Sequence, residues 1–338
     1  MDKPLVSIII PVHNRFVWLE KAIQSVINQT YSNFELIIVD DYSFPPVSEK
    51  LGIDDRRIRI IRSNENQGPG VSRELGRLNS KGEFINFLDS DDYFHPEKIE
   101  KQIEFLQNEP EINMCYCTSV IFENEPFSEP EIIYSLSDKH FETIIPIILF
   151  QRPWPTSSWL WRREFTKKIG GWSSLWVGED IEYEIRAACF ESKIGFLPEK
   201  LTFIRVNNEH EQLSKYSKQR RITGTDYKLR IAQNLKKSSY CSNSQVRIKI
   251  FEIILNQLIF LLSKNEIVLA KRCLIELYSF KESSTSNTFF FIILKLVFFF
   301  PQQKLGILLL RKLRKIIFQK KFDQINGNLS IYESSYSH

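Results

Sequence analysis

The chain has 338 residues, of which 43% are hydrophobic, enough to bury one large core or two modest ones. Its net charge of +4 is small and its basic residues are dispersed, which argues against a nucleic-acid-binding protein. The five cysteines are odd in number and lack framework spacing, so they predict buried thiols in a reducing compartment rather than disulfides or a zinc site.

The N-terminal third alternates between apolar strands and an amphipathic helix. Val6–Asn14 contains a near-continuous β-branched run, which predicts a buried strand that ends in a loop. A helical pattern runs from Trp18 to Gln29, and a second buried strand, Phe34–Val39, leads directly into Asp40 and Asp41. Strand, helix and strand at this spacing predict a βαβ unit with parallel strands and a right-handed crossover.

The alternation continues with a strand at Ile58–Arg62, a helix at about Val71–Leu78 and an apolar strand that begins at Phe84. In sheets of this kind, ligands bind outside the carboxyl ends of the strands. His13 and Asp41 both follow such ends, as does the acidic stretch after the Phe84 strand. We therefore expect one crevice to hold them all.

That acidic stretch places Asp89, Asp91 and Asp92 within four positions. Crowded carboxylates destabilise a strand end unless positive charge lies among them. Oxygen ligands suit Mg2+ or Mn2+, which usually share their coordination with the phosphates of a substrate. A capped turn before the helix that begins near Pro96 explains one aspartate but not three, so the stretch predicts phosphate chemistry.

Several motifs in chain order resemble those of family 2 glycosyltransferases. They are Val6–Asn14, Val39-Asp40-Asp41-x-Ser43, Asn66-x-Gly68 with Ser72-Arg73-x-x-Gly76, Phe87–Asp92, Gly170-Gly171-Trp172 and Gly178-Glu179-Asp180. The resemblance covers roughly residues 4–215. It implies an inverting enzyme with the GT-A fold, a Rossmann-like α/β domain with a mostly parallel central sheet, which uses a nucleotide-diphosphate sugar.

The resemblance also implies a donor site, made by Pro11, Val12, His13, Asp41, Arg73, Asp89 and Ser90. Asp41 would accept a hydrogen bond from the imide of uracil or thymine, which favours a UDP- or dTDP-sugar. Asp91 would bind Mg2+ or Mn2+ directly, and Asp89 would contact the metal or the ribose. Two alternatives stay open: that Asp41 only caps the next turn, and that Arg73 is only a solvated helix residue.

Asp180 is the predicted general base. It falls with Glu179 in the first turn of a predicted helix, where the macrodipole favours an ionised carboxylate. Acids also occur there simply as good helix starters. The interval from the Gly170-Gly171-Trp172 motif favours the catalytic role, in which Asp180 deprotonates the hydroxyl group of an acceptor.

Other positions give weaker signals. His210, Arg220 and Arg221 are expected either to reach the diphosphate or to lie on the surface. Tyr42 stands where this family commonly has glycine, so a different backbone conformation is expected there. Five tryptophans gather around the predicted acceptor region, where one or two could line the site and the others would be core: Trp154, Trp159, Trp161, Trp172 and Trp176.

The sequence predicts three parts: residues 1–110 as the nucleotide-sugar half, 111–225 as the acceptor half, and 226–338 as a helical extension. Helical patterns cover Ile222–Lys237, Ser244–Ser263 and Glu266–Lys281. Residues 288–321 mix apolar residues with clustered cations over stretches too short to span a bilayer, a pattern typical of a helix at an anionic membrane surface. Docking of these helices onto the catalytic domain or a second subunit is the alternative.

The resemblance therefore implies a metal-dependent glycosyltransferase, and the expected acceptor is a glycan or lipid-linked glycan. The first strand begins within about five residues, so we expect no signal peptide, and a cytoplasmic enzyme that is peripheral at the inner face of the membrane. A catalytically inactive nucleotide-sugar-binding scaffold is the alternative. A sugar-nucleotide pyrophosphorylase would need a glycine-rich loop where Pro11–Arg15 has no glycine, and a glycosidase would not need a nucleotide crevice.

Overall fold

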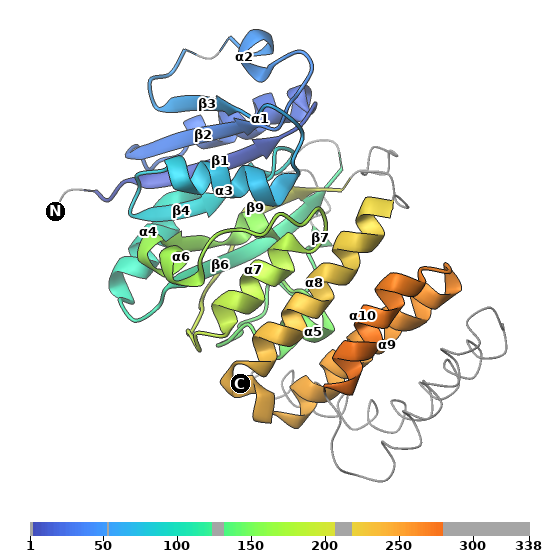
Figure 1. Cartoon of the computed structure of the whole chain (residues 1–338). Helices are drawn as coiled ribbons and strands as arrows, with labels where there is room; N and C mark the ends of the chain where they lie inside the picture. The colour runs from blue at the N-terminus through green and yellow to red at the C-terminus, as the bar shows by residue number, and fades with distance from the viewer. Residues whose placement is uncertain (1–2, 53, 124–131, 207–217, 280–338) are drawn as a thin grey trace. The chain divides into compact units, whose positions relative to one another are not determined.

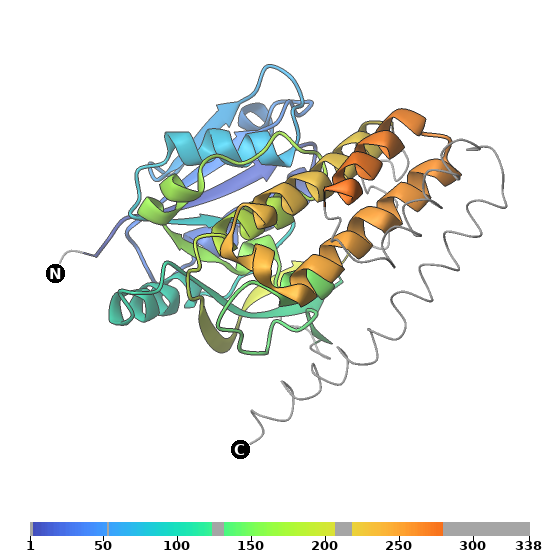
Figure 2. The same cartoon turned by 60° about the horizontal axis from the view of Figure 1, so that its bottom comes forward.

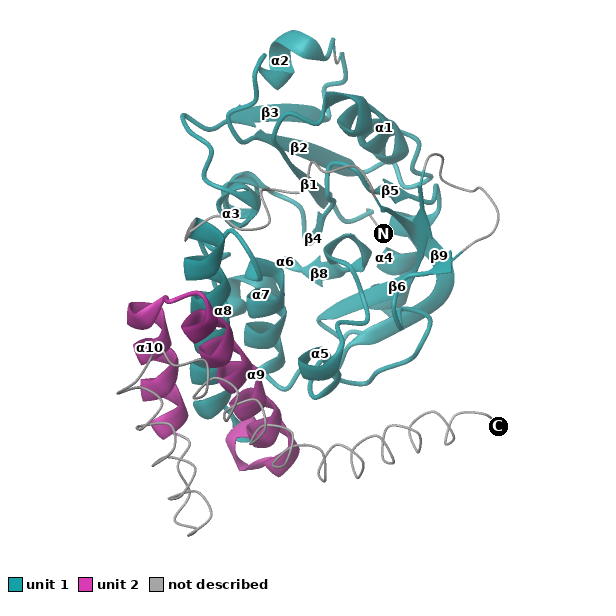
Figure 3. Cartoon of the chain, turned by 90° about the vertical axis from the view of Figure 1, so that its right-hand side faces the viewer, with its two compact units in different colours: residues 1–239 teal, residues 240–338 magenta. Residues whose placement is uncertain are grey.

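The computed structural model describes residues 3–52, 54–123, 132–206 and 218–279. It divides into two compact units, residues 1–239 and 240–338 (Figure 3). The boundary predicted at residues 225 and 226 falls inside a helix of the first unit. His210 and the segment 288–321 lie outside the described residues.

The predicted βαβ alternation is confirmed at the N-terminus (Figure 1). Four parallel strands stand in the order β3-β2-β1-β4, each paired in register with its neighbour. Their bounds are β1 Val6–Val12, β2 Phe34–Asp40, β3 Ile58–Arg62 and β4 Phe84–Phe87, with α1 Phe16–Ile27, α2 Val47–Lys50 and α3 Pro69–Asn79 between them.

The sheet continues beyond β4 as a mixed sheet in the order β4-β8-β6-β9-β5, with β7 paired to β6. The ladder between β6 and β9 is parallel and long, whereas the antiparallel ladders of β8, β5 and β7 are short. The strands are β5 Tyr93–Phe94, β6 Met114–Phe122, β7 Ile132–Ile133, β8 Leu160–Arg162 and β9 Gly195–Arg205.

Short helices connect these strands, and longer ones follow. They are α4 Lys98–Asn108, α5 Ile147–Phe150, the 3-10 helix η1 Thr156–Ser158, α6 Arg163–Ile169, α7 Glu179–Ala188, α8 Lys218–Lys236 and the 3-10 helix η2 Ser239–Ser242. Helix α7 packs along α8 within the first unit (Figures 1 and 2).

Strand β1 is buried on both faces, which explains its continuous apolar sequence. Ile8 and Ile10 belong to the core cluster that contains the apolar face of α1. Ile9 points the other way, and its side chain lies against Gly76 of α3, where an added Cβ would come within 2.3 Å of it. Close packing of α3 on the sheet therefore depends on the glycine of the Ser72-Arg73-x-x-Gly76 motif.

The described part of the second unit is a pair of contacting helices, α9 Ser244–Ser263 and α10 Ile267–Tyr278. The side chain of Asn243 caps α9 by accepting hydrogen bonds from the backbone N–H groups of Gln245 and Val246. The helical patterns predicted beyond residue 222 are thus confirmed as far as Tyr278. Among the described residues, no helix combines the length and the apolar character that crossing a bilayer requires.

Candidate active site

A pocket of about 420 Å³ opens where β1, β2 and β4 end. All residues predicted for the donor and metal sites line it: Pro11, Val12, His13, Asp41, Arg73, Asp89, Ser90 and Asp91. The start of α3 and the ring of Trp176 also contribute to its wall. The parallel strand ends thus bring together side chains that are up to about 80 residues apart in sequence, as the rule for such sheets predicts.

Asp41 uses its carboxylate to hold the loop that precedes α3. Its two oxygens accept hydrogen bonds from the backbone N–H groups of Gln67, at 2.9 Å, and Gly68, at 2.8 Å. Burial raises the pKa of Asp41 above its ordinary value, although these two hydrogen bonds oppose the rise. The turn after β2 is capped by Asp40 instead, whose Oδ1 accepts from the backbone N–H of Ser43 at 2.8 Å.

The loops after β1 and β2 are joined next to the pocket. The Nδ1 of His13 lies 2.7 Å from the carbonyl oxygen of Asp41 and donates a hydrogen bond to it. Tyr42, the next residue, has φ of 64°, in the left-handed region that glycine adopts readily. The expectation of a different backbone conformation is therefore wrong: tyrosine takes a conformation that is typical of glycine, at a cost of about 1–2 kcal/mol.

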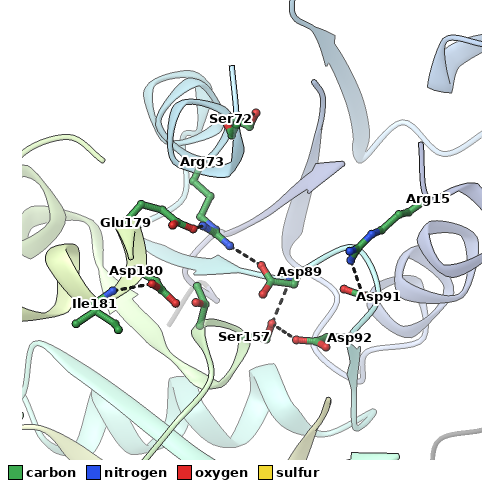
Figure 4. Close-up of polar contacts among 12 residues, drawn as sticks. Arg15, Ser72, Arg73, Asp89, Asp91, Asp92, Ser157, Glu179, Asp180 and Ile181 are labelled. Carbon is green, nitrogen blue, oxygen red and sulfur yellow. Dashed lines mark hydrogen bonds and ion pairs between the residues drawn. The ribbon is translucent and has the colours of Figure 1, made fainter. Parts of the chain in front are cut away.

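The three aspartates after β4 have different partners (Figure 4). Asp89 forms an ion pair with Arg73 at 2.6 Å, and Asp91 forms one with Arg15 at 2.5 Å. Asp92 is buried and accepts a hydrogen bond from the hydroxyl of Ser157 at 2.6 Å. The same hydroxyl accepts from the backbone N–H of Asp89 at 3.1 Å, so Ser157 braces the acidic loop from η1.

Burial raises the pKa of both Asp91 and Asp92. For Asp91, Arg15 opposes this rise, whereas for Asp92 the negative charges of Asp89 and Asp91 add to it. Of these two carboxylates, Asp91 is the one that lines the pocket, and the positive charge of Arg15 partly compensates its burial. Asp92 supports the loop from behind through Ser157. It does not cap the helix that follows, because α4 has no side-chain cap hydrogen bond.

Arg73 lies between two carboxylates (Figure 4). Its side chain is buried, with Nη1 at 2.8 Å from Glu179 and Nη2 at 2.6 Å from Asp89. The guanidinium also faces the ring of Trp172 at 4.9 Å. Arg73 is therefore not a solvated helix residue: it links α3, the acidic loop and α7 from one side of the pocket.

Asp180 stands in the first turn of α7, directly after Glu179. Its Oδ2 forms an ion pair with Arg152 at 2.6 Å, and its Oδ1 accepts from the backbone N–H of Ile181 at 2.8 Å. Burial raises the pKa of Asp180, but the positive charges of Arg152 and then Arg73 outweigh burial and leave it below its ordinary value. Glu179 differs: burial and the charge of Asp180 raise its pKa, although Arg73 opposes them. The pKa values of these neighbouring acids thus shift in opposite directions.

Asp89 and Asp91 fit a metal that shares its coordination with a substrate. Each forms an ion pair with arginine through one oxygen, Oδ1 of Asp89 and Oδ2 of Asp91, so each has a second oxygen beside the pocket. In the described ranges, no three His, Cys, Asp or Glu side chains form a group that could hold a metal by themselves. Mg2+ in nucleotide enzymes typically takes one or two carboxylates plus phosphates and water, which matches this pair.

Most of the tryptophans are core residues, as their usual behaviour predicts. Trp154, Trp159, Trp161 and Trp172 are buried, whereas Trp176 lines the pocket. Its indole ring packs on Gly68, where an added Cβ would lie 3.2 Å from the ring. Arg220 and Arg221 lie in the first turn of α8, and neither is among the described residues that line the pocket.

Four functional residues were not predicted from sequence: Arg15, Arg152, Ser157 and Glu179. Arg15 could have been found, because it directly follows the polar end of β1. Glu179 belongs to the Gly178-Glu179-Asp180 motif and to the first turn of a predicted helix, but neither pattern indicates that it binds Arg73. Arg152 and Ser157 occur in a stretch without periodicity, and the aspartates that they bind are 28 or more residues away in sequence. Only the fold brings them to the site.

Comparison with known proteins places residues 7–169 in the family described as "Glycosyl transferase family 2". Among curated proteins, an uncharacterized glycosyltransferase of Rickettsia felis is 48% identical over 104 residues, covering 30% of this chain and 17% of the relative. A putative teichuronic acid biosynthesis glycosyltransferase of Bacillus subtilis, TuaG, is 37% identical over 107 residues, covering 31% of this chain and 42% of the relative. The chain thus spans less than half the length of these relatives.

Among solved structures, residues 1–349 of Staphylococcus aureus TarS in complex with UDP-GlcNAc superpose with a TM-score of 0.59 at 18% identity. The match covers 74% of this chain and 71% of the TarS chain. At this identity the likeness shows the fold. It confirms the predicted GT-A architecture with its Rossmann-like half. The central sheet, predicted to be mostly parallel, is parallel in the order β3-β2-β1-β4 and mixed beyond β4, where short antiparallel strands complete it.

Proposed function

Because this chain belongs to glycosyl transferase family 2 through residues 7–169, we propose that it transfers a sugar from a nucleotide-diphosphate donor to a hydroxyl acceptor with inversion. One observation carries the proposal. The lining of a pocket of about 420 Å³ at the carboxyl ends of the parallel strands includes the carboxylates of Asp89 and Asp91 and their arginine partners. Paired opposite charges around such a pocket suit a ligand that contains both phosphate and metal.

The donor's nucleoside would lie against the main chain of Pro11–His13. Asp41 would accept the imide N–H of a uracil or thymine base, which favours a UDP- or dTDP-sugar. Its two oxygens already accept one hydrogen bond each, yet a carboxylate offers about four acceptor positions. The TarS structure was solved with UDP-GlcNAc, which also supports a uridine donor.

Asp91 and Asp89 would hold Mg2+ or Mn2+. When bound, the metal would offset the negative charge that develops on the leaving diphosphate. Arg15 and Arg73, which now neutralise these aspartates, would be close enough to contact phosphate oxygens once a donor enters. Ser90, which lines the pocket, would contact the donor. Ser157 would keep the loop in place, because it is bound to both ends of it.

Asp180 would act as the general base. It would take the proton of the acceptor hydroxyl while that oxygen attacks the anomeric carbon opposite the diphosphate. The lowered pKa of Asp180, caused by Arg152 and Arg73 against the effect of burial, keeps the carboxylate ionised at neutral pH. Glu179 suits this role less well, because its side chain is less accessible, 9% exposed against 23% for Asp180, and its carboxylate is bound to Arg73.

The test is a thermal-shift and donor-hydrolysis screen of UDP-, dTDP- and GDP-sugars with Mg2+, Mn2+ or EDTA. We expect a UDP- or dTDP-sugar with metal, at 100 times its Kd, to raise the melting temperature by about 5–10 °C. Asp91→Ala should lose this rise. EDTA alone should leave the melting temperature unchanged, because arginines already compensate the aspartates.

Asp54→Ala is the control, since Asp54 is an exposed aspartate outside the pocket. A shift that Asp91→Ala retains would contradict the metal assignment. Binding without release of nucleoside diphosphate, even with candidate glycan acceptors, would favour the alternative of an inactive nucleotide-sugar-binding scaffold.

The proposed acceptor is a glycan or lipid-linked glycan of a cell-surface polysaccharide, a context that the printed name of TuaG supports. The proposed location is the cytoplasmic face of the membrane, with contact through residues 288–321. The support is the sequence of that segment, in which Arg311, Lys312, Arg314 and Lys315 alternate with apolar residues.

Vesicle flotation tests this location. The full chain should float with anionic vesicles and not with neutral ones. Replacing Arg311, Lys312, Arg314 and Lys315 by glutamine should release it, because each cation near an anionic surface contributes about 1 kcal/mol. Equal recovery of both proteins in the anionic lipid fraction would contradict an electrostatic membrane contact.

A further inference from the structure

Arg152 lies in the segment between α5 and η1 and bridges two acids on the same face of α7. Asp180 and Glu184 are four residues apart, so one helical turn separates them and both reach the same guanidinium. The Asp180 contact is 2.6 Å, and the side chains of Arg152 and Asp180 are 16% and 23% exposed. A bridge at this depth fixes the direction of each carboxylate.

The guanidinium of Arg152 is itself held in place. Its Nε donates to Oε2 of Glu184 at 3.1 Å, and its Nη2 donates to Oε1 of Glu184 and to Thr156. Glu184 is in turn bound by the indole N–H of Trp154 at 3.0 Å. Since Trp154 and Glu184 are buried, the arginine cannot follow Asp180 if that carboxylate rotates.

Several titratable or charged groups face Asp180 from the elements around it. They are Glu179 and Glu184 on α7, Arg73 on α3, Arg152 before η1, Tyr134 after β7 and Tyr227 on α8. Burial, followed by the charge of Asp180, raises the pKa of Tyr227 to about 12, so this group is neutral at physiological pH. Among the described residues, Arg152 and Arg73 are the cations that lower the pKa of Asp180, and Arg73 is shared with Asp89 and Glu179.

We propose that Arg152 is the positioning residue of the base: its guanidinium fixes the direction of the Asp180 carboxylate and keeps it ionised for the acceptor hydroxyl, an inference that rests on the proposed function. The contact with Glu184 orients the arginine, and the arginine orients the aspartate. Arg152 acts through Asp180 and lies outside the set of described residues that line the donor pocket.

The test compares two variants of the full chain. Glu184→Gln removes a buried charge but keeps an acceptor for Trp154, and Arg152 remains. Adding Arg152→Met to it removes the cation without leaving Glu184 charged and unpaired, so the double variant avoids the main cost of a broken buried ion pair. The difference between the two isolates the contact between Arg152 and Asp180.

Two readouts are needed. The pKa of Asp180 is measured by NMR of carboxyl-labelled aspartate, assigned with Asp180→Asn. It should be higher in the double variant than in Glu184→Gln by roughly one unit or more, because Arg152 then no longer helps Arg73 and the backbone N–H of Ile181 to oppose burial. The acidic limb of the pH profile of kcat should move to higher pH by the same amount. At a pH below the pKa of Asp180, each pH unit of this displacement lowers kcat about tenfold, while the donor KM stays unchanged.

Arg186→Met is the matched control, since Arg186 pairs with Glu182 on the same helix at a similar exposure of 20%. It should change stability without moving the pKa of Asp180. An unchanged pKa and pH profile in the double variant would overturn the inference. A raised pKa in a protein that transfers no sugar would instead overturn the proposed function and leave the positioning role of Arg152 standing.

Discussion

Asp180→Asn is expected to lower kcat for sugar transfer by about 10²- to 10⁴-fold, the usual contribution of a general base. Asparagine keeps the size of the side chain and can still accept a hydrogen bond from the N–H of Ile181. It cannot accept the proton of an acceptor hydroxyl. Because the loss would concern only the transition state, kcat should fall and the donor KM should not.

Donor binding should survive this substitution. Of the described residues that line the pocket, Glu179 and not Asp180 comes from α7. The measurement is therefore a pair: transfer kinetics, and the metal-dependent thermal shift with the donor. Loss of both would mean that Asp180 has a structural role, and a kcat within about threefold of wild type would remove it as the base.

Asp55→Asn is the matched control. Asp55 also pairs with an arginine, Arg57, at 2.7 Å, and its hydrogen bonds with Arg57 lower its pKa to about 2. It lies before β3, outside the pocket. If kcat falls in Asp180→Asn and not in Asp55→Asn, the loss of an ion pair with arginine is not the cause. The fall is then specific to the carboxylate at position 180.

The fold was largely predictable because hydrophobic period and strand ends are local signals. Strand β1 and helix α9 follow their predicted ranges closely, and the strand-end rule placed Asp41 and Asp89 in one pocket. The short strands β5, β7 and β8 were not predicted. Each contains two or three residues and is defined by its partner strand, so no local pattern reports it.

The sequence predicts the negative charges of the site but not that arginines balance them. The crowded aspartates indicated that positive charge must lie nearby, and a metal was the positive charge expected. In the folded chain, Arg15 and Arg73 already supply it, from the end of β1 and from α3. The sequence reveals Asp89 and Asp91 because they lie close together in the chain. Their arginine partners, Arg73 and Arg15, lie 16 and 76 residues away from them. A site balanced by arginines can fold before donor and metal arrive.

This balance makes Arg73→Leu the most destabilising substitution expected in the donor half. Removing one partner of a buried ion pair leaves a charge in the interior, at a cost of about 3–5 kcal/mol. Here Glu179 would lose its partner, and its carboxylate is nearly buried, 9% exposed. Because all six tryptophans lie in residues 1–239, the tryptophan fluorescence of a urea titration reports this unit.

The pH dependence of the stability of Arg73→Leu shows whether the unpaired charge of Glu179 causes the destabilisation. Burial and Asp180 already raise the pKa of Glu179 while Arg73 lowers it, so without Arg73 the pKa rises further. The folded state would then hold a proton that the unfolded state releases, and stability must fall as the pH rises from the unfolded pKa, about 4.3, to the folded one. Arg73→Leu should therefore lose less stability, compared with wild type, at pH 5 than at pH 8.

Two further variants show whether Arg73→Leu is destabilised by the unpaired charge of Glu179 or by lost packing. Adding Glu179→Gln to Arg73→Leu should recover roughly 1–3 kcal/mol at pH 8, because an amide replaces the unpaired charge. Arg77→Leu, on the same helix and paired with Glu74 at 2.7 Å, should cost about 1 kcal/mol and show no such pH dependence. If Arg73→Leu loses equal stability at both pH values, then lost packing against Trp172 is the cause, and Arg73 does not act as the counter-charge of the acids around the pocket.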